Sequence, residues 1–309
     1  MISFARLLLR RAALLVALPA SVFVAVDLLP GNTARAVLGR EATPEQIAAK
    51  EHQLGLDRPL PVRFWDWISG VATGDFGHTA RGRSVNELLV DKFPPTLLLG
   101  GLALALTVLA SLGLGAWWAA RPGSAATRVL QPATTTAVAI PEFVISTVLI
   151  LVFALALGWL PAVTITDRSG FPAGPDMLVL PVLALALPQI GWNTRVVRAA
   201  LADAAEAPHV ESAVLDGLST RVVLARHVLP FALPTIVASF ATTVGMLLGG
   251  SLVVETIFNY PGLGAVLAGS VADRDTSVVA AVVALSGVVI MGMLAAADGI
   301  RAWSLRGRR

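Results

Sequence analysis

Six long apolar stretches restrict the fold of this chain more than any other feature. A helix needs about 20 mostly apolar residues to cross the hydrocarbon layer of a membrane. Stretches of about that length lie at 8–29, 96–119, 131–158, 177–197, 231–254 and 278–300. None alternates apolar and polar residues over about ten positions between turns, so a β-barrel is not expected. The sequence therefore predicts an all-α integral membrane protein with about six transmembrane helices.

The composition supports a membrane location. Hydrophobic residues make up 56% of the 309 residues and charged residues only 14%, whereas soluble domains carry about 25% charged residues. The chain has no cysteine, which excludes disulfides and thiolate chemistry. In so apolar a chain, the net charge of +3 indicates basic loops that orient the protein in a membrane, and no nucleic-acid partner is expected.

The first apolar stretch, 8–29, has two interpretations. Its early arginines and apolar core are shared with signal peptides. It is long, however, and no small-x-small cleavage site precedes Leu28-Leu29-Pro30. We therefore interpret it as a retained first transmembrane helix.

The arginines predict which side of the membrane each loop occupies. If the N-terminus lies in the cytoplasm, the cytoplasmic pieces carry most arginines, whereas the short outer loops, 159–176 and 255–277, hold only Arg168 and Arg274. Basic residues favour the cytoplasmic side. Both termini are thus predicted inside. The expected single domain, 1–309, comprises a first helix at 8–29, an extracytoplasmic segment at 30–95, a five-helix core at 96–300 with a long loop at about 199–230, and a cytoplasmic tail at 301–309.

The extracytoplasmic segment, 30–95, is predicted to be folded rather than a plain linker. Thr43-Pro44-Glu45-Gln46 combines an N-cap residue, a proline at the first helical position and an acidic first turn. A short amphipathic helix that ends at Gly55 is therefore expected there.

The longest cytoplasmic piece, 195–230, is too polar to span a membrane and has helical patterning. Gly217 can take the left-handed conformation that ends a helix, and Ser219 or Thr220 can cap the next one. The prediction is a helix, a sharp turn and a second helix that leads into the fifth span. Periodicity alone leaves two roles open: an element that docks into a partner protein, or an interfacial amphipathic helix that lies on lipid.

This loop and five other motifs resemble one family. The loop resembles the Glu-Ala-Ala (EAA) signature of permeases in binding-protein-dependent ABC importers, with Ser212 and His227 as departures. The matching residues are Glu211, Ser212, Ala213, Gly217, Leu229 and Pro230. The ordered motifs at Leu28–Gly31, Thr43–Gln46, Leu54–Leu60, Gly74–Gly77 and 254–264 are similar to the first of two permeases in the dipeptide, oligopeptide and nickel branch. The basic tail, Leu305–Arg309, departs from the family's usual ending.

The resemblance implies a pore subunit that is not itself an enzyme. ATP and Mg would bind to two separate ATPase subunits, and this chain would hold no cofactor, metal or catalytic residue. The expected partners are a second homologous permease, the ATPases, an extracytoplasmic substrate-binding protein and membrane lipid. Short peptides are the expected cargo, with nickel complexes or haem as alternatives. The residues expected to couple to the ATPase are Glu211, Ser212, Ala213, Gly217, Leu218, Arg221, Leu229 and Pro230.

Two acidic residues are candidates for the translocation path or its gate. Glu142 follows Pro141 inside the third apolar stretch, where an acid is costly unless it faces a cavity or a partner. It would contact a cationic part of the substrate, or else lie at the interface or pair with an arginine of the partner permease. Glu255 lies in a family motif at the end of the fifth stretch, and a gate or subunit-interface role is expected.

Functions of other classes have less support in the sequence. A stand-alone secondary transporter commonly shows repeated halves with broken helices, and no repeat is visible here. An intramembrane enzyme would need a nucleophile elbow or a metal dyad, and neither motif occurs. No G-x-x-x-x-G-K-S/T loop is present either, so the energy source is expected on another chain.

Overall fold

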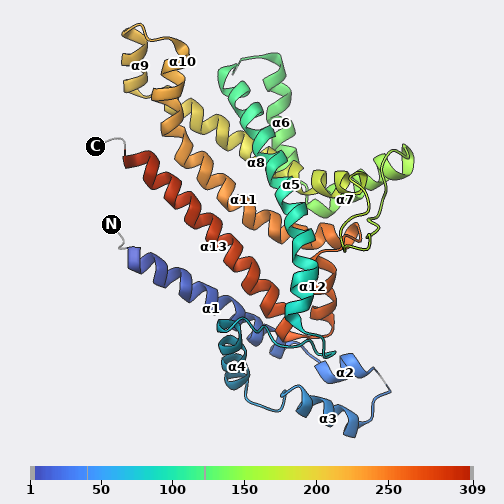
Figure 1. Cartoon of the computed structure of the whole chain (residues 1–309). Coiled ribbons are helices and arrows are strands. Elements are labelled where there is room, and N and C mark those ends of the chain that lie inside the picture. The colour runs from blue at the N-terminus through green and yellow to red at the C-terminus, as the bar shows by residue number, and fades with distance from the viewer. Residues whose placement is uncertain (1–3, 40, 122, 307–309) are drawn as a thin grey trace.

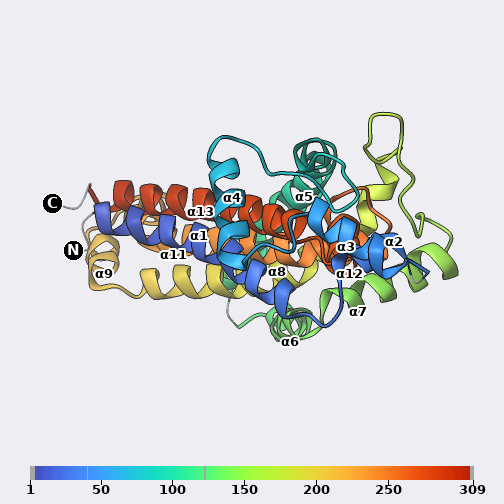
Figure 2. The same ribbon diagram turned by 90° about the horizontal axis from the view of Figure 1, so that it is seen from below.

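A computed structural model describes residues 4–39, 41–121 and 123–306, and it confirms the all-α prediction. Long helices lie roughly side by side (Figure 1). Figure 2 shows both ends of the chain and α9 at one end of the molecule, with α2, α3 and α12 toward the other. Within the described residues, β-structure is limited to two isolated bridges.

The described residues contain five helices long and apolar enough to cross a membrane, or six if one bent pair counts as a single span. Four of the predicted stretches, 8–29, 177–197, 231–254 and 278–300, fall on such helices. The second, 96–119, is the later part of a helix that already begins at Val85 and runs through Pro94 and Pro95. The five are α1 (Phe4–Leu28), α5 (Val85–Ala120), α8 (Asp176–Ala205), α11 (Leu229–Ile257) and α13 (Thr276–Arg306).

The third predicted stretch, 131–158, is not one straight helix. It is divided between α6 (Ala125–Ala139) and α7 (Glu142–Leu149), and α7 continues as the π-helix η1 (Ile150–Ala156). The two parts are bent by 107°. Pro141 disfavours a helical conformation at the preceding residue, and Ile140 is extended, with φ −88° and ψ 123°. The break places Glu142 at the start of a new helix.

Segment 30–95 is folded, as predicted, into α2 (Thr33–Leu38), α3 (Pro44–Gln53) and α4 (Leu60–Ala72), followed by the start of α5. Thr43 caps α3 and forms a reciprocal capping box with Gln46. α4 packs against α1, because Phe23 lies between Phe64 and Trp67 at ring-centroid distances of 5.3 and 5.5 Å.

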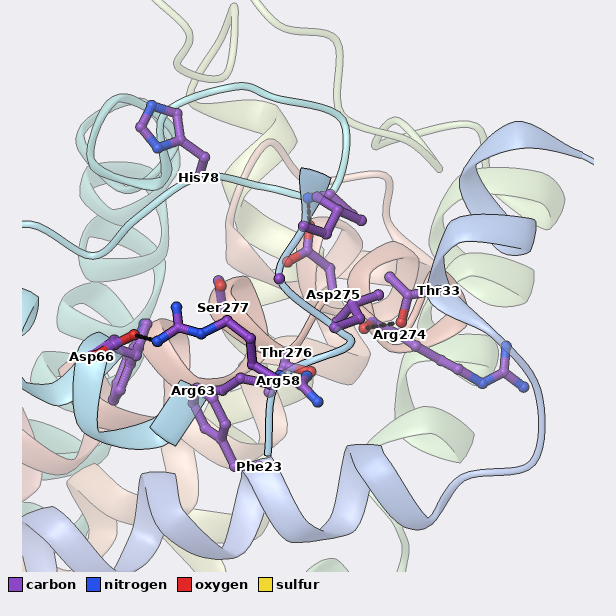
Figure 3. Close-up of a pocket in the computed structure, with 15 residues that line it drawn as sticks. Phe23, Thr33, Arg58, Arg63, Asp66, His78, Arg274, Asp275, Thr276 and Ser277 are labelled. Atoms are coloured by element: carbon purple, nitrogen blue, oxygen red, sulfur yellow. Dashed lines mark hydrogen bonds and ion pairs between the residues drawn. The ribbon is translucent and has the colours of Figure 1, made fainter. Parts of the chain in front are cut away.

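Side-chain contacts fasten this segment to the rest of the chain around a cavity of about 210 Å³ (Figure 3). The Ala80 amide donates to Asp275 Oδ2 at 2.6 Å, just before α13 begins. The Thr33 hydroxyl donates to the Arg274 carbonyl at 3.2 Å. Burial raises the pKa of the Asp275 carboxyl. Segment 30–95 therefore covers the end of α1 and the start of α13 and is bonded to both.

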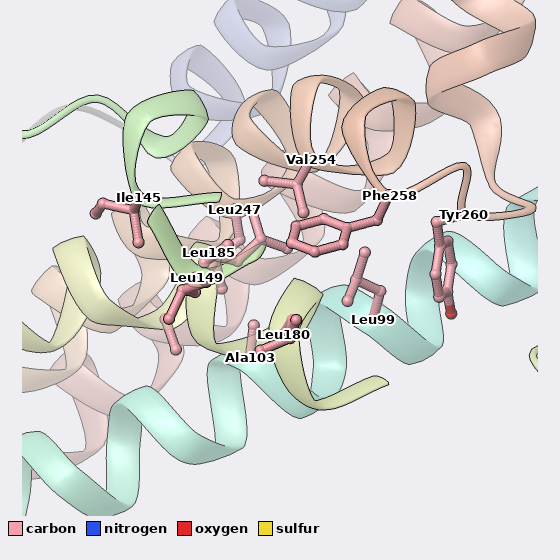
Figure 4. Packing of buried hydrophobic residues seen from close by; sticks show 12 residues of the cluster. Leu99, Ala103, Ile145, Leu149, Leu180, Leu185, Leu247, Val254, Phe258 and Tyr260 are labelled. Carbon is pink, nitrogen blue, oxygen red and sulfur yellow. The ribbon is translucent and has the colours of Figure 1, made fainter. Parts of the chain in front are cut away.

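The central core lies between α5, α7, α8 and α11 (Figure 4). Leu99, Leu180, Leu185, Leu247 and Phe258 are among its buried members. Small residues let the helices approach closely. A Cβ added at Gly115 of α5 would lie 2.7 Å from Val197 Cβ of α8, and one at Gly191 of α8 would lie 2.7 Å from the Thr134 carbonyl of α6.

Glu255 ties the end of α11 to the next helix, α12 (Leu263–Ala272). Its Oε2 accepts a hydrogen bond from the Gly264 amide at 2.5 Å, and the Leu263 amide donates to Thr96 Oγ1 of α5 at 2.9 Å. These two amides belong to the first turn of α12 and lack partners within that helix. The buried carboxylate is thus a helix cap, and the first turn of α12 is anchored to two long helices.

The close packing at α12 predicts opposite effects for two glycines on this helix. Gly264→Ala would push a Cβ against the Leu252 carbonyl and Glu255, whereas a Cβ at Gly269 meets nothing within 4 Å. We expect Gly264→Ala to lower stability by ~1–3 kcal/mol. Gly269→Ala should be neutral or stabilising by up to ~1 kcal/mol. Thermal unfolding of the purified chain in detergent measures both, and equal melting temperatures would contradict the packing described.

Candidate functional site

The 199–230 loop folds as a helix, a turn and a second helix, as predicted. After α8 come α9 (Pro208–Leu215), α10 (Thr220–Val223) and the π-helix η2 (Leu224–Val228), which leads directly into α11. α9 begins at Pro208, a residue suited to the first position of a helix. Gly217 has φ +76°, the left-handed conformation predicted for the turn, and Ser219 occupies the N-cap position of α10.

The inner side of α9 is packed against the helices that carry it. Val210 and Ala213 are buried in a cluster with Val197 of α8 and Ile236 of α11. The ring Nε2 of His209 lies 2.9 Å from the His227 carbonyl oxygen, and the His209 and Phe231 rings are 4.1 Å apart. Because α9 contacts both neighbours, it is held as part of a rigid unit.

The outer side of α9 exposes an apolar tip, which consists of Val214, Leu215 and Leu218. Their exposed fractions are 58%, 80% and 42%. Figure 1 shows α9 and α10 at an extremity of the molecule, so these side chains are free to meet another protein. Glu211 and Ser212 are exposed beside the tip.

The predicted coupling residues do not share one surface. Glu211, Ser212, Gly217, Leu218, Arg221 and Leu229 are exposed, Pro230 is half-buried, and Ala213 is buried. Sequence reasoning missed Val214 and Leu215. Which residues of α9 face outward depends on its packing, since burial of Val210 and Ala213, three residues apart, turns Val214 and Leu215 outward.

A buried hydrogen-bond network joins the two helices on either side of α9. Asn193 of α8 donates through Nδ2 to Thr243 Oγ1 of α11 at 2.8 Å, and the Ser239 hydroxyl donates to Asn193 Oδ1 at 2.7 Å. Polar contacts between membrane helices contribute about 0.6 kcal/mol each on average. We call Asn193, Ser239 and Thr243 the α8–α11 clamp. The clamp holds together the two helices against which α9 packs.

The two acidic candidates have different surroundings. Glu142, at the start of α7, lines a cavity of about 430 Å³ together with Gln189 and Met246. A Cβ added at Gly250 of α11 would lie 3.4 Å from Glu142 Oε1. Glu255 is instead fully buried as the cap of α12. The geometry thus favours Glu142 over Glu255 as a residue that faces an open space, and the gate role of Glu255 stays a prediction.

Nothing in the described part of the chain resembles a metal centre. Groups of three or more His, Cys, Asp or Glu side chains placed to hold a metal ion are absent among the residues that the structure describes. His209 and His227 do come together, at a ring-centroid distance of 6.4 Å, and they act as packing residues at the base of α9.

Comparisons with known proteins give the class of protein that this fold defines. Residues 111–309 match the family of binding-protein-dependent transport system inner membrane components, and residues 1–100 match the N-terminal model of such membrane components. The chain belongs to this family: it is a multi-pass protein of the cytoplasmic membrane and a permease of the peptide and nickel branch of ABC importers.

Named relatives fall in the same branch. The chain is 36% identical over 265 residues to the glutathione transport system permease protein GsiC of Salmonella typhi, covering 85% of this chain and 84% of the relative. Identity to GsiC of Escherichia coli is 34% over the same length and coverage. A probable peptide ABC transporter permease of Sinorhizobium fredii is 31% identical over 273 residues, 87% of each chain.

The left-handed turn at Gly217 predicts a graded response to substitution. Valine at φ +76° is strained by about 1–2 kcal/mol, whereas asparagine tolerates this conformation. We expect Gly217→Val to loosen the turn and to speed tryptic cleavage after the exposed Arg221 about tenfold. Gly217→Asn should be cleaved at nearly the wild-type rate. The assignment of the turn fails if valine and asparagine have the same effect.

Proposed function

We propose that this chain is one of two pore subunits of an ATP-driven importer of short peptides, and that α9 is the element through which ATPase subunits drive it. The observation that carries the proposal is the architecture of α9. One side is buried against α8 and α11, and the other exposes Val214, Leu215 and Leu218 at the end of the molecule. This geometry suits a short helix that docks into another protein and transmits its movement to α8 and α11.

The distribution of charge supports placing α9 in the cytoplasm. The end of the molecule that carries α9 also holds both ends of the chain (Figure 2). Arg10 and Arg11 at the start of α1 and Arg301 near the end of α13 lie toward that end. Basic residues favour the cytoplasmic side of a membrane. Segment 30–95 then faces outward, where a substrate-binding protein would deliver its cargo.

The interfacial-helix alternative fits α9 less well. A helix that lies on lipid needs a substantial apolar face along its length. α9 has only eight residues, and two of its apolar residues, Val210 and Ala213, are used for internal packing. The exposed apolar residues form a compact tip beside polar groups, which is what a groove on a protein would receive.

The remaining components follow from the family. ATP and Mg would bind to two ATPase subunits, and a second, homologous permease would complete the pore. The relatives named for glutathione and peptide transport support short peptides as the cargo. Membership of this family supports a membrane subunit whose energy comes from its partners.

The apolar tip provides the test. Leu215→Asp places a charge where an apolar contact with the ATPase is proposed, so we expect ATPase subunits to be lost on purification in mild detergent. A matched control is Leu38→Asp, which alters an exposed leucine on α2 at the opposite end. ATPase retention on the Leu215→Asp variant, or equal loss from both variants, would reject the proposed docking.

A further inference from the structure

We propose that this chain binds the two charged ends of a zwitterionic short peptide in a groove along α6 and α8, and that the peptide passes with its carboxylate toward the α9 end. The inference rests on the proposed importer function and assigns it a substrate contact. The α6–α8 groove is defined by Glu142, Gln189, Trp192, Gln131, Arg195 and Arg198.

Two neighbouring cavities make up the groove. One, of about 430 Å³, is lined by Glu142, Gln189 and Trp192. The other, of about 410 Å³, is lined by Trp192, Gln131 and the two arginines. Trp192 lines both cavities, and their other α8 residues lie before and after it in the sequence, so the two cavities follow each other along α8. Because α8 runs toward α9, the arginine end of the groove is the end nearer the coupling region.

The charges in the groove lack partners of their own. Glu142 and Arg195 form no ion pair or side-chain hydrogen bond within the described residues. Glu142 belongs to a bent helix pair that is apolar enough to cross a membrane, whereas Arg195 lies toward the α9 end of α8. An unpaired charge that faces lipid is costly, and such residues usually face water, a ligand or a partner. The face of α7 that carries Glu142 therefore does not lie against lipid.

Gln189 gives an independent sign that a polar ligand belongs here. Its side chain is only 6% exposed, lines the groove, and its Oε1 has no hydrogen-bond partner among the described residues. Leaving a buried polar atom unpaired costs roughly 1–3 kcal/mol. Arg198 shows the same property at the other end, since its Nε is unpartnered while its guanidinium lies 5.2 Å from the Trp118 ring centroid.

The spacing of the charges matches a short peptide. The rise of an α-helix is about 1.5 Å per residue, so Gln189, which lines the same cavity as Glu142, and Arg195 are about 9 Å apart along α8. An extended peptide spans about 3.3–3.6 Å per residue, and a tripeptide is thus about 10 Å long. An ammonium group at Glu142 and a carboxylate at Arg195 would be satisfied together. Trp192 between them offers an apolar surface to side chains.

The charge distribution in the groove can be tested with charged thiol reagents, which does not require the cargo to be known. The chain has no cysteine of its own, so a single introduced cysteine is the only site of reaction on it. Gln131→Cys reports on the arginine end and Met246→Cys on the Glu142 end. In the whole importer, we expect a negatively charged thiol reagent to react about tenfold faster than a positively charged one at position 131, and the reverse at position 246. Arg195→Gln and Glu142→Gln should each abolish the preference at their own end.

Transport is measured with trialanine and glutathione as probes in proteoliposomes that contain all subunits and the cognate binding protein. We expect Glu142→Gln and Arg195→Gln to lower the maximal uptake rate about tenfold, with ATPase stimulation by the loaded binding protein kept within about twofold. Glu87→Gln and Arg128→Gln are matched controls, because both side chains are exposed outside the groove. They should transport normally.

The outcomes separate this inference from the proposed function. Absence of charge preference at both cysteines would overturn the groove as a charged path, as would wild-type uptake by both groove variants. If the reagents never reach the cysteines, the groove is filled by the partner permease, and the proposal of a peptide path in it is overturned. If charge preference is found but neither probe is imported by the wild type, the peptide-importer proposal fails while the charged groove stands.

Discussion

The clamp between α8 and α11 is the contact on which the rest of the functional architecture depends. Asn193 is fully buried and bonded to both Ser239 and Thr243, so the two helices cannot slide past each other without breaking buried polar contacts. α9 packs between the C-terminal half of α8 and the N-terminal half of α11. A force applied to the tip of α9 is therefore carried into the middle of the molecule instead of being absorbed by a loose loop.

The groove arises from two local features of the chain. α6 ends just before Pro141 and the chain turns by 107°, which leaves Glu142 at a helix start instead of in the middle of a helix. Gly191 lets α6 approach α8 closely. Arg195 and Arg198 then lie on α8 next to the same helix. Because α8 carries one wall of the groove and also leads into α9, a movement of α9 would alter the groove directly.

Much of the fold follows from the sequence because it depends on local rules. Apolar length predicted the long helices, Thr43 predicted a helix start, and Gly217 predicted the turn. The start of α5 at Val85 was missed because Pro94 and Pro95 and the polar residues before them were taken as the end of the outer segment. Proline inside a helix is unfavourable by itself, and burial of Val85 and Leu88 against α13 and α12 compensates for it.

The candidate site was only half predictable. The EAA motif pointed to the loop that we propose as the coupling element, but the motif residues are partly buried, and the exposed tip at Val214 and Leu215 needed the packing of α9 to be known. In the sequence, Arg195 contributed only to the count of arginines that predicts the orientation in the membrane. Its relation to Glu142 depends on the bend after α6 and the pairing of α6 with α8, and neither is encoded in the spacing of residues that are far apart in the chain.

The central claim is that α9 and α8 move as one body and thereby alter the groove, and a distance measurement on the assembled importer tests it most directly. Spin labels at Asp216→Cys, at the end of α9, and Ala199→Cys, in the groove, are compared with and without ATP trapped on the ATPases. The account predicts an unchanged label-to-label distance, together with a change in the reactivity of Gln131→Cys toward thiol reagents. A distance that changes while the groove cysteine reacts identically in both states would contradict it.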